Sequence, residues 1–329
     1  MTESSQTVGN YEFLGIVDKP TAGVTYKVRN LTTGEFEVLR ALPGASYGDS
    51  ESLQRFLREI KIHTRLSHPN IVAFHDALEL DGHLIMTAEF VEGTTLAELC
   101  RQGPMSSAEA IRAICDVLSG LEEAHALGIV HRGITAEHVM VTKEGTVKLG
   151  GFGLAKPAAD ANLTQAGAVL GDTRYISPEQ VTGTATLDAR ADLYSVGVLL
   201  FQALTGRVPF DGPNDFDIMV AQVSKNAPRP SLWNPGISPE LEGIVLTALA
   251  KKPDDRFSGA KDFRTALAAL NGPLVVLPQP AAPVEQMPQP AAPQFLTQAE
   301  DGGTRRTAIV LASVCVVIGL IVLFFAVMH

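Results

Sequence analysis

The sequence predicts an α+β fold in which a small β-rich lobe precedes a larger helical lobe and one transmembrane helix follows. Three observations lead to this prediction. Residues 11–42 contain short strand-like runs separated by Gly and Thr turns. Further along, apolar residues recur at helical spacing over residues 107–127, 190–204 and 239–249. Near the C-terminal end, residues 308–328 form one apolar run without a charged side chain.

The small lobe is expected to contain one helix and a further strand. The segment SLQRFLREIKIHTRL, residues 52–66, places Leu53, Phe56 and Ile60 at helical spacing. The segment HLIMTAEFV, residues 83–91, is typical of a strand. The predicted boundaries are an N-terminal tail at 1–10, a folded domain at 11–271 with lobes at about 11–90 and 91–271, a Pro-rich linker at 272–306 and a membrane helix at 307–329.

The composition excludes several classes of protein. The 329 residues, 46% of them hydrophobic, suffice for a sizeable core. A formal net charge of −10 argues against a general nucleic-acid-binding protein, because such proteins present a basic face. Cys100, Cys115 and Cys315 form no CxxC pair, which indicates a reducing compartment. The histidines show no metal-ligand spacing, so we expect no metal site.

The C-terminal region predicts a membrane anchor behind a spacer. At about 1.5 Å per residue, a helix over Ala308–Met328 would reach roughly 31 Å, which matches the hydrocarbon core of a bilayer. Arg305 and Arg306 precede the run, so the folded domain is expected in the cytoplasm and the chain in the inner membrane as a single-pass protein. The unit PQPAAP begins at Pro278 and again at Pro288. Such proline density favours extended polyproline II, as a plain spacer or as a ligand for an aromatic-lined groove.

Six segments in order resemble the motifs of protein kinases, and of bacterial membrane-anchored Ser/Thr kinases of the eukaryotic-like family in particular. They are FLREIKIHTRLSHPNIV, AEFVEGTTL, VKLGGFGLAK, GDTRYISPEQ, ADLYSVGVLLFQALTGRVPF and KKPDDRF. The resemblance implies a two-lobed kinase-like fold. It also implies that His131 and Phe152 stack with Phe74 on an anchor at Asp192. The remaining structural positions that it assigns are Arg132 and the pair Glu179–Arg256.

At the nucleotide cleft the chain departs from the family pattern. The phosphate-covering loop is similar to VDKPTAGVT, where Asp18 and Pro20 replace two glycines and only Gly23 is kept. A proline lacks an N–H donor and an aspartate repels phosphate, so both changes oppose nucleotide binding. Arg40 replaces the family's lysine and is expected to pair with Glu59. The remaining cleft positions are Thr25, Val38, Ala88 and Glu89.

The catalytic positions depart further. In VHRGITAEHVMV, Gly133 replaces the family's catalytic Asp, Thr135 its lysine and His138 its metal-binding Asn. Gly151 replaces the metal-binding Asp of the DFG motif, and Asp172 replaces a threonine. Magnesium prefers oxygen ligands, which glycine and histidine side chains do not supply. We therefore expect no catalytic residue intact, no bound metal and no cofactor.

The resulting hypothesis is a membrane-tethered pseudokinase that acts by protein binding, as a scaffold or an allosteric partner. Its expected partners are proteins, among them an active kinase or its substrates, with the membrane bound through Ala308–Met328 and no nucleic acid. The helix face around Glu59 and residues 154–175, with Thr164 and Thr173 as phosphoacceptors, are the surfaces that the resemblance favours. The alternative is a divergent Ser/Thr kinase, or an ATP-binding protein with residual phosphotransfer, which would use ATP and magnesium.

Overall fold

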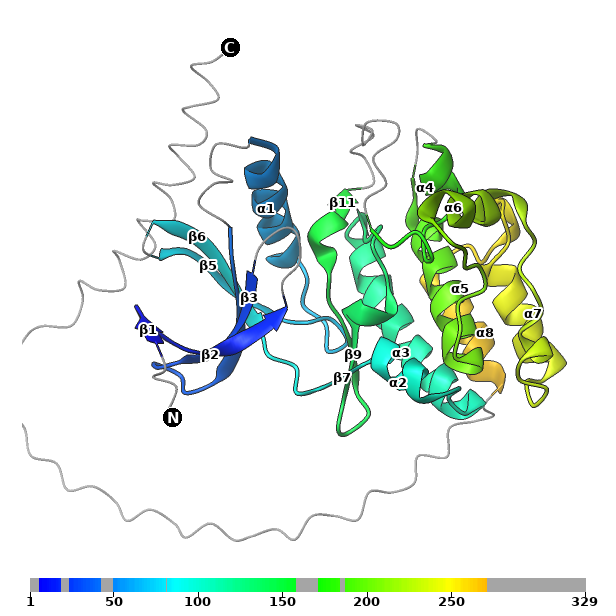
Figure 1. Ribbon diagram of the computed structural model, residues 1–329, viewed down its shortest axis with the longest axis horizontal. Coiled ribbons are helices and arrows are strands. Elements are labelled where there is room, and N and C mark those ends of the chain that lie inside the picture. The colour runs from blue at the N-terminus through cyan, green and yellow to red at the C-terminus, as the bar shows by residue number, and fades with distance from the viewer. Residues whose placement is uncertain are drawn as a thin grey trace, which may run out of the picture. The chain divides into compact units, whose positions relative to one another are not determined.

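The structure, a computed structural model, describes residues 6–18, 24–42, 50–80, 82–157, 171–183 and 187–270. The predicted linker and membrane span lie outside these residues, as do Pro20, Gly23 and Thr164. Within the described ranges no helix combines the length and the apolar character needed to cross a bilayer. The described elements belong to one unit, and Figure 1 shows its largest sheet in one lobe and most of its helices in another.

The N-terminal lobe is built on a six-stranded antiparallel sheet with the order β1-β2-β3-β4-β6-β5. Its strands are β1 (Gln6–Val8), β2 (Tyr11–Asp18), β3 (Val24–Asn30), β4 (Phe36–Ala41), β5 (Phe74–Leu80) and β6 (His83–Glu89). Residues 1–10 were expected to be a tail, yet β1 pairs with β2 as an edge strand. On the central strands, Val38 pairs with Ala88, and Arg40 lies between Thr25 and Met86.

Helix α1 (Ser50–His63) covers the small lobe, as the apolar spacing predicted. Phe56 of this helix is buried with Leu42 and Met86 in a small core cluster of its own. The same helix buries Glu59 and His63, which are one turn apart and therefore share a face. Helix α1 thus carries a carboxylate and an imidazole toward the interior rather than to solvent.

The C-terminal lobe is mainly helical. Its helices are α2 (Leu96–Gln102), α3 (Ser107–Ala126), α4 (Pro178–Thr182), α5 (Ala189–Thr205), α6 (Asp215–Ser224), α7 (Pro239–Ala248) and α8 (Ala260–Leu270). Short pairings connect β7 (Gly93–Thr95), β9 (Val139–Thr142) and β10 (Val147–Leu149), and also β8 (Ile129–Val130) with β11 (Lys156–Pro157). Single 3-10 turns are η2 (Ala136–His138), η3 (Phe152–Leu154), η4 (Pro230–Leu232) and η5 (Pro253–Asp255).

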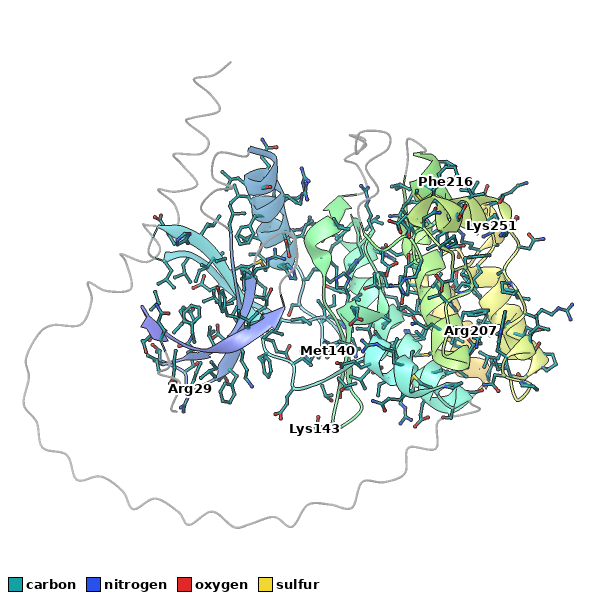
Figure 2. The ribbon with its side chains drawn as sticks, viewed as in Figure 1. Arg29, Met140, Lys143, Arg207, Phe216 and Lys251 are labelled. Atoms are coloured by element: carbon teal, nitrogen blue, oxygen red, sulfur yellow. The ribbon has the colours of Figure 1, made fainter. Side chains whose placement is uncertain are left out.

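The long helices of this lobe follow from their sequences. Ser106 caps α3 and forms a capping box with Glu109, which satisfies the free N–H groups of the first turn. Helix α5 begins after its cap Asp188 and is apolar on nearly every side, so it lies at the centre of the core. Helices α2, α4, α6 and α8 were not predicted from apolar spacing. Helix α6 presents Phe216 to solvent, 69% exposed and labelled in Figure 2.

Candidate active site

Arg40 of β4 is engaged by the protein rather than open to the cleft. Its guanidinium forms the expected ion pair with Glu59 of α1, whose side chain is 7% exposed. Arg40 also lies 5.3 Å from the centroid of the Phe56 ring, and its Nη2 contacts Met86 Sδ at 3.4 Å. Because these partners come from the sheet and from α1, the Arg40 guanidinium ties the helix to the sheet.

Small and branched side chains of the central strands occupy three of the positions that the resemblance assigns to the nucleotide cleft. Thr25, Val38 and Ala88 are each half-buried there. Lys27 Nζ lies 4.0 Å from the centroid of the Phe90 ring, just after β6. Glu89 Oε2 accepts a hydrogen bond from Lys148 Nζ at 2.8 Å. Glu89, one of the predicted cleft positions, therefore already has a partner from the C-terminal lobe.

Four rings form a continuous internal stack between the lobes. The ring of Phe74 lies 6.1 Å from His63, His63 lies 5.5 Å from Phe152, and Phe152 lies 4.4 Å from His131. The expected stack of Phe74, Phe152 and His131 is thus present, with His63 inserted between the two phenylalanines. His63 was not predicted as part of the site, although its i, i+4 spacing from Glu59 places both on one face of α1.

Asp192 of α5 anchors the loop that follows β8. Its carboxylate accepts hydrogen bonds from the backbone N–H groups of His131 and Arg132, each at 2.8 Å, and from His125 Nε2 at 2.8 Å. The carboxylate is fully buried, which opposes ionisation, but the hydrogen bond and charge of His125 keep its pKa below the ordinary value. Arg132 adopts a left-handed backbone with φ of 63° at this anchor.

His131 is held as a neutral ring. Its Nε2 lies 2.8 Å from the carbonyl oxygen of Gly150, to which it donates, and its Nδ1 accepts from the N–H of Gly133 at 3.3 Å. One nitrogen must therefore carry a proton and the other must lack one. Burial lowers the pKa of His131 to about 4, in agreement with this arrangement.

His138 occupies the space next to Gly151. Its Nδ1 donates to the carbonyl oxygen of Gly133 at 2.7 Å, which fixes the ring across the loop. A Cβ atom at Gly151 would come within 2.6 Å of Cδ2 and 2.7 Å of Nδ1 of that ring. Gly151 also has a φ of +78°, which residues other than glycine rarely adopt. The imidazole thus fills the place where a side chain at position 151 would begin.

The structure brings together Gly133, Thr135 and Asp172, the other three degenerate positions. They border one cavity of about 10 Å³, which is at most the room of a single water molecule. Asp172 is paired with Arg174, whose Nε lies 2.9 Å from Oδ1. Thr173 is only 4% exposed and donates to Asp215 at 2.8 Å, so it is poorly placed as a phosphoacceptor in this structure.

Glu179 and Arg256 form the expected pair. Arg256 Nη1 and Nη2 lie 2.7 and 2.8 Å from the two carboxylate oxygens of Glu179. The Arg256 side chain is fully buried and also donates to the carbonyl oxygens of Arg190, Ala250 and Lys251. A two-pronged ion pair with satisfied remaining donors is the arrangement in which a buried guanidinium is tolerated.

Gly23 and the side chain of Asp18 lie outside what the structure describes, so their predicted roles remain predictions. Within the described ranges, no group of three or more His, Cys, Asp or Glu side chains is arranged to hold a metal ion.

The chain is similar to protein kinases along most of its length. A sequence model of the family described as "Protein kinase domain" matches residues 11–270. Among curated relatives, serine/threonine-protein kinase PrkC of Bacillus subtilis is 32% identical over 256 residues, covering 78% of this chain and 39% of the relative. PknL of Mycobacterium tuberculosis is 36% identical over 233 residues, covering 70% of this chain and 58% of the relative. This chain therefore spans less than two thirds of these relatives.

Solved structures agree with this similarity. The crystal structure of the PknI kinase domain of Mycobacterium tuberculosis has a TM-score of 0.62 and 26% sequence identity. The match covers 81% of this chain and 98% of that one.

Proposed function

Since the chain belongs to the protein kinase domain family, we propose that it is a catalytically inactive member, which acts by binding other proteins. The contact between His138 and Gly151 is the main support for this proposal. At the position where the family holds its metal through a carboxylate, this chain has a glycine, and a histidine ring fills the adjacent space. A carboxylate at position 151 would meet that ring before it could reach a metal.

The residues present do not fit magnesium. Phosphoryl transfer in this family rests on positioning and on charge neutralisation by metal-bound carboxylates. Three described carboxylates reach the site, and each already has a basic partner: Glu59 pairs with Arg40, Glu89 with Lys148 and Asp172 with Arg174. His138 would offer an imidazole, whereas magnesium prefers oxygen. No step of the reaction can therefore be derived for these side chains.

The proposed activity is binding through the outer surface of the kinase-like domain, with Ala308–Met328 as the membrane anchor. The stack of rings joins the two lobes, the Arg40–Glu59 pair ties α1 to the sheet, and Asp192 holds the loop after β8. A rigid domain presents a constant surface to a partner. Glu59 itself is turned inward, so the face of α1 available to a partner is the one that carries Leu57, which is 36% exposed.

The test is thermal unfolding of the full chain in detergent micelles, with millimolar magnesium alone and with magnesium plus ATP. A ligand at a hundred times its dissociation constant adds about 2.7 kcal/mol to stability, which raises the unfolding temperature by several degrees. We expect no shift beyond that of magnesium alone. A shift that requires both ATP and magnesium, followed by phosphate transfer to a protein substrate, would contradict the proposal.

The names of the relatives favour a second candidate, a divergent Ser/Thr protein kinase with residual phosphotransfer. Under this candidate, magnesium-dependent transfer should be lost in Asp172→Asn, because Asp172 borders the cavity shared by Gly133 and Thr135. Asp254→Asn is the matched control, since Asp254 is 89% exposed, pairs with Arg190 and does not border that cavity. Transfer that survives Asp172→Asn would contradict a role of Asp172 in this chemistry.

A further inference from the structure

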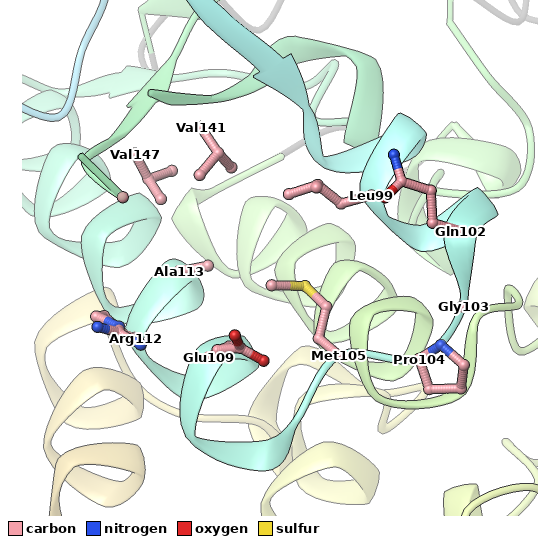
Figure 3. Close-up of a pocket in the computed structure, with 11 residues that line it drawn as sticks. Leu99, Gln102, Gly103, Pro104, Met105, Glu109, Arg112, Ala113, Val141 and Val147 are labelled. Atoms are coloured by element: carbon pink, nitrogen blue, oxygen red, sulfur yellow. The ribbon is translucent and has the colours of Figure 1, made fainter. Parts of the chain in front are cut away.

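The helical lobe contains a groove of about 380 Å³ that the proposed function does not use (Figure 3). It lies between α2, the start of α3 and the β9–β10 hairpin, and we call it the α2–α3 groove. Figure 3 shows Leu99, Met105, Val141 and Val147 directed toward one shared space. Leu99, Met105 and Val141 are half-buried, so each retains apolar surface that an occupant could cover.

The lining of the groove indicates the chemistry of its occupant. Polar side chains, Gln102, Glu109 and Arg112, are also part of the lining, so the groove carries charges of both signs. None of the described residues that line it is aromatic. Grooves that hold polyproline II helices are lined by aromatic rings, so the PQPAAP units do not suit this one. A short, uncharged stretch of branched apolar side chains suits this groove better.

Helix α8 carries the chain to the edge of this groove. The side chain of Arg264 pairs with Glu122 at 2.6 Å, whereas the Arg264 carbonyl oxygen lies 4.0 Å from Cys115 Sγ. Helical side chains lean toward the N-terminus and carbonyl groups point toward the C-terminus, so α8 runs antiparallel to α3. Six residues later, Leu270 therefore lies beside the first turns of α3, where Arg112 lines the groove.

The residues that follow Leu270 have the composition that the groove requires. Residues 273–278 read PLVVLP, and the first charged residue beyond Leu270 is Glu285. The prolines at both ends oppose a helix and favour an extended chain. Residues 271–273 can span up to roughly 10 Å when extended, which is about the width of the helix that they must pass.

We propose that Leu274–Leu277 binds in the α2–α3 groove of its own chain. The four apolar side chains would otherwise follow directly on a folded domain with their surface in water. Bound in the groove, they cover Leu99, Met105 and Val141. The segment would bind in the groove whether or not the domain transfers phosphate.

The test is disulfide formation in the full chain in detergent micelles, on a Cys315→Ser background. One variant carries Met105→Cys with Val276→Cys, and its matched control carries Ala108→Cys with Val276→Cys. Ala108 is exposed one turn from Arg112 but does not line the groove. Burial raises the pKa of Cys100 and of Cys115 to about 11, so these native thiols react slowly.

Under mild oxidation we expect the Met105→Cys pair to close at least about 10-fold faster than the Ala108→Cys pair, because docking raises the effective concentration at the groove. Adding Leu274→Asp and Leu277→Asp should remove this difference. Equal rates for the two pairs would overturn the proposal, since a tether alone brings both sites within reach. A disulfide between differently tagged copies would overturn it too, because the occupant would then come from a second chain.

Discussion

The two ends of the segment from His131 to His138 differ in what holds them. At the first end, the backbone of His131 and Arg132 is bound by the buried carboxylate of Asp192. At the other end, His138 bonds to the backbone of Gly133 and lies against a glycine at position 151. One end keeps a charged group that the fold uses. The other end lacks the charged group that a metal would use.

This difference separates two kinds of carboxylate within one loop. Asp192 is enclosed by hydrogen-bond donors of the protein, so removing it would leave buried N–H groups without partners. A carboxylate at position 151 would have needed a metal or another cation to satisfy it. Without that cation, a glycine and a packed histidine are the more stable solution. This difference is the one that the proposed absence of metal binding predicts.

The largest expected effect tests the first end. Asp192→Ala should lower the free energy of unfolding by about 3–5 kcal/mol, because three donors lose a buried charged acceptor. Urea unfolding of the full chain measures it. Asp254→Ala is the control, since its carboxylate is 89% exposed and should contribute less than about 1 kcal/mol. Similar losses in both variants would remove the distinction between the two kinds of carboxylate.

The next effect tests the second end. Gly151→Ala should cost about 2–4 kcal/mol, from a positive φ and from the contact of the new Cβ with the His138 ring. Gly145→Ala shares the positive φ, 84°, but has nothing within 4 Å, so it measures the backbone contribution alone. Combining Gly151→Ala with His138→Ala should recover the part of this stability loss that comes from the contact with the His138 ring. If the stability loss of the double variant equals the sum of the two single losses, the His138 ring does not fill the space beside position 151.

A third effect concerns pH. The folded pKa of His131 is about 4, below its ordinary value of 6.5, so the unfolded chain binds the proton more readily. Stability should therefore be fully present above pH 6.5 and decline as pH falls toward 4, by roughly 3 kcal/mol at most for this group. Burial also lowers the pKa of His63, which adds a loss of the same sign.

Urea unfolding at pH 7.5 and pH 5 measures this dependence, and His131→Phe is the informative variant. It keeps a ring in the stack with Phe152 but removes the titrating nitrogen. The variant should be less stable at neutral pH and should show a smaller loss between the two pH values. An unchanged pH dependence would mean that His131 is not the main group responsible.

The smallest effect concerns an exposed ion pair in the same loop. Glu137 pairs with Arg101 at 3.2 Å, and the two side chains are 63% and 66% exposed. Glu137→Ala should change the unfolding free energy by less than about 0.5 kcal/mol, because water screens such pairs. The same urea titration measures it. A loss near that of Asp192→Ala would show that position in the loop matters more than burial.

Much of the fold could be predicted from apolar spacing. The helix predicted at 107–127 is observed as Ser107–Ala126, and that predicted at 190–204 as Ala189–Thr205. Helix α6 could not be predicted in this way, because Phe216, Val220 and Val223 recur at helical spacing yet face solvent. The buried face of α6 includes the polar Gln222, so the spacing of apolar residues does not distinguish the buried face of this helix from its exposed face.

The residues of the site could be predicted, but not how their side chains pack against one another. The resemblance indicated the Arg40–Glu59 and Glu179–Arg256 pairs, and both are present. It did not indicate that His63 completes the stack of rings or that His138 fills the space beside Gly151. These contacts join segments far apart in sequence, and no local spacing encodes which ring fills a vacated place.

The contact between His138 and Gly151 also restricts the order in which this lineage could change. A substitution that returns aspartate to position 151 alone places its Cβ against the imidazole. We expect such a variant to be less stable than the present chain, for the reason given for Gly151→Ala. Position 138 must therefore change first, at a time when its replacement has no metal to bind and brings no benefit.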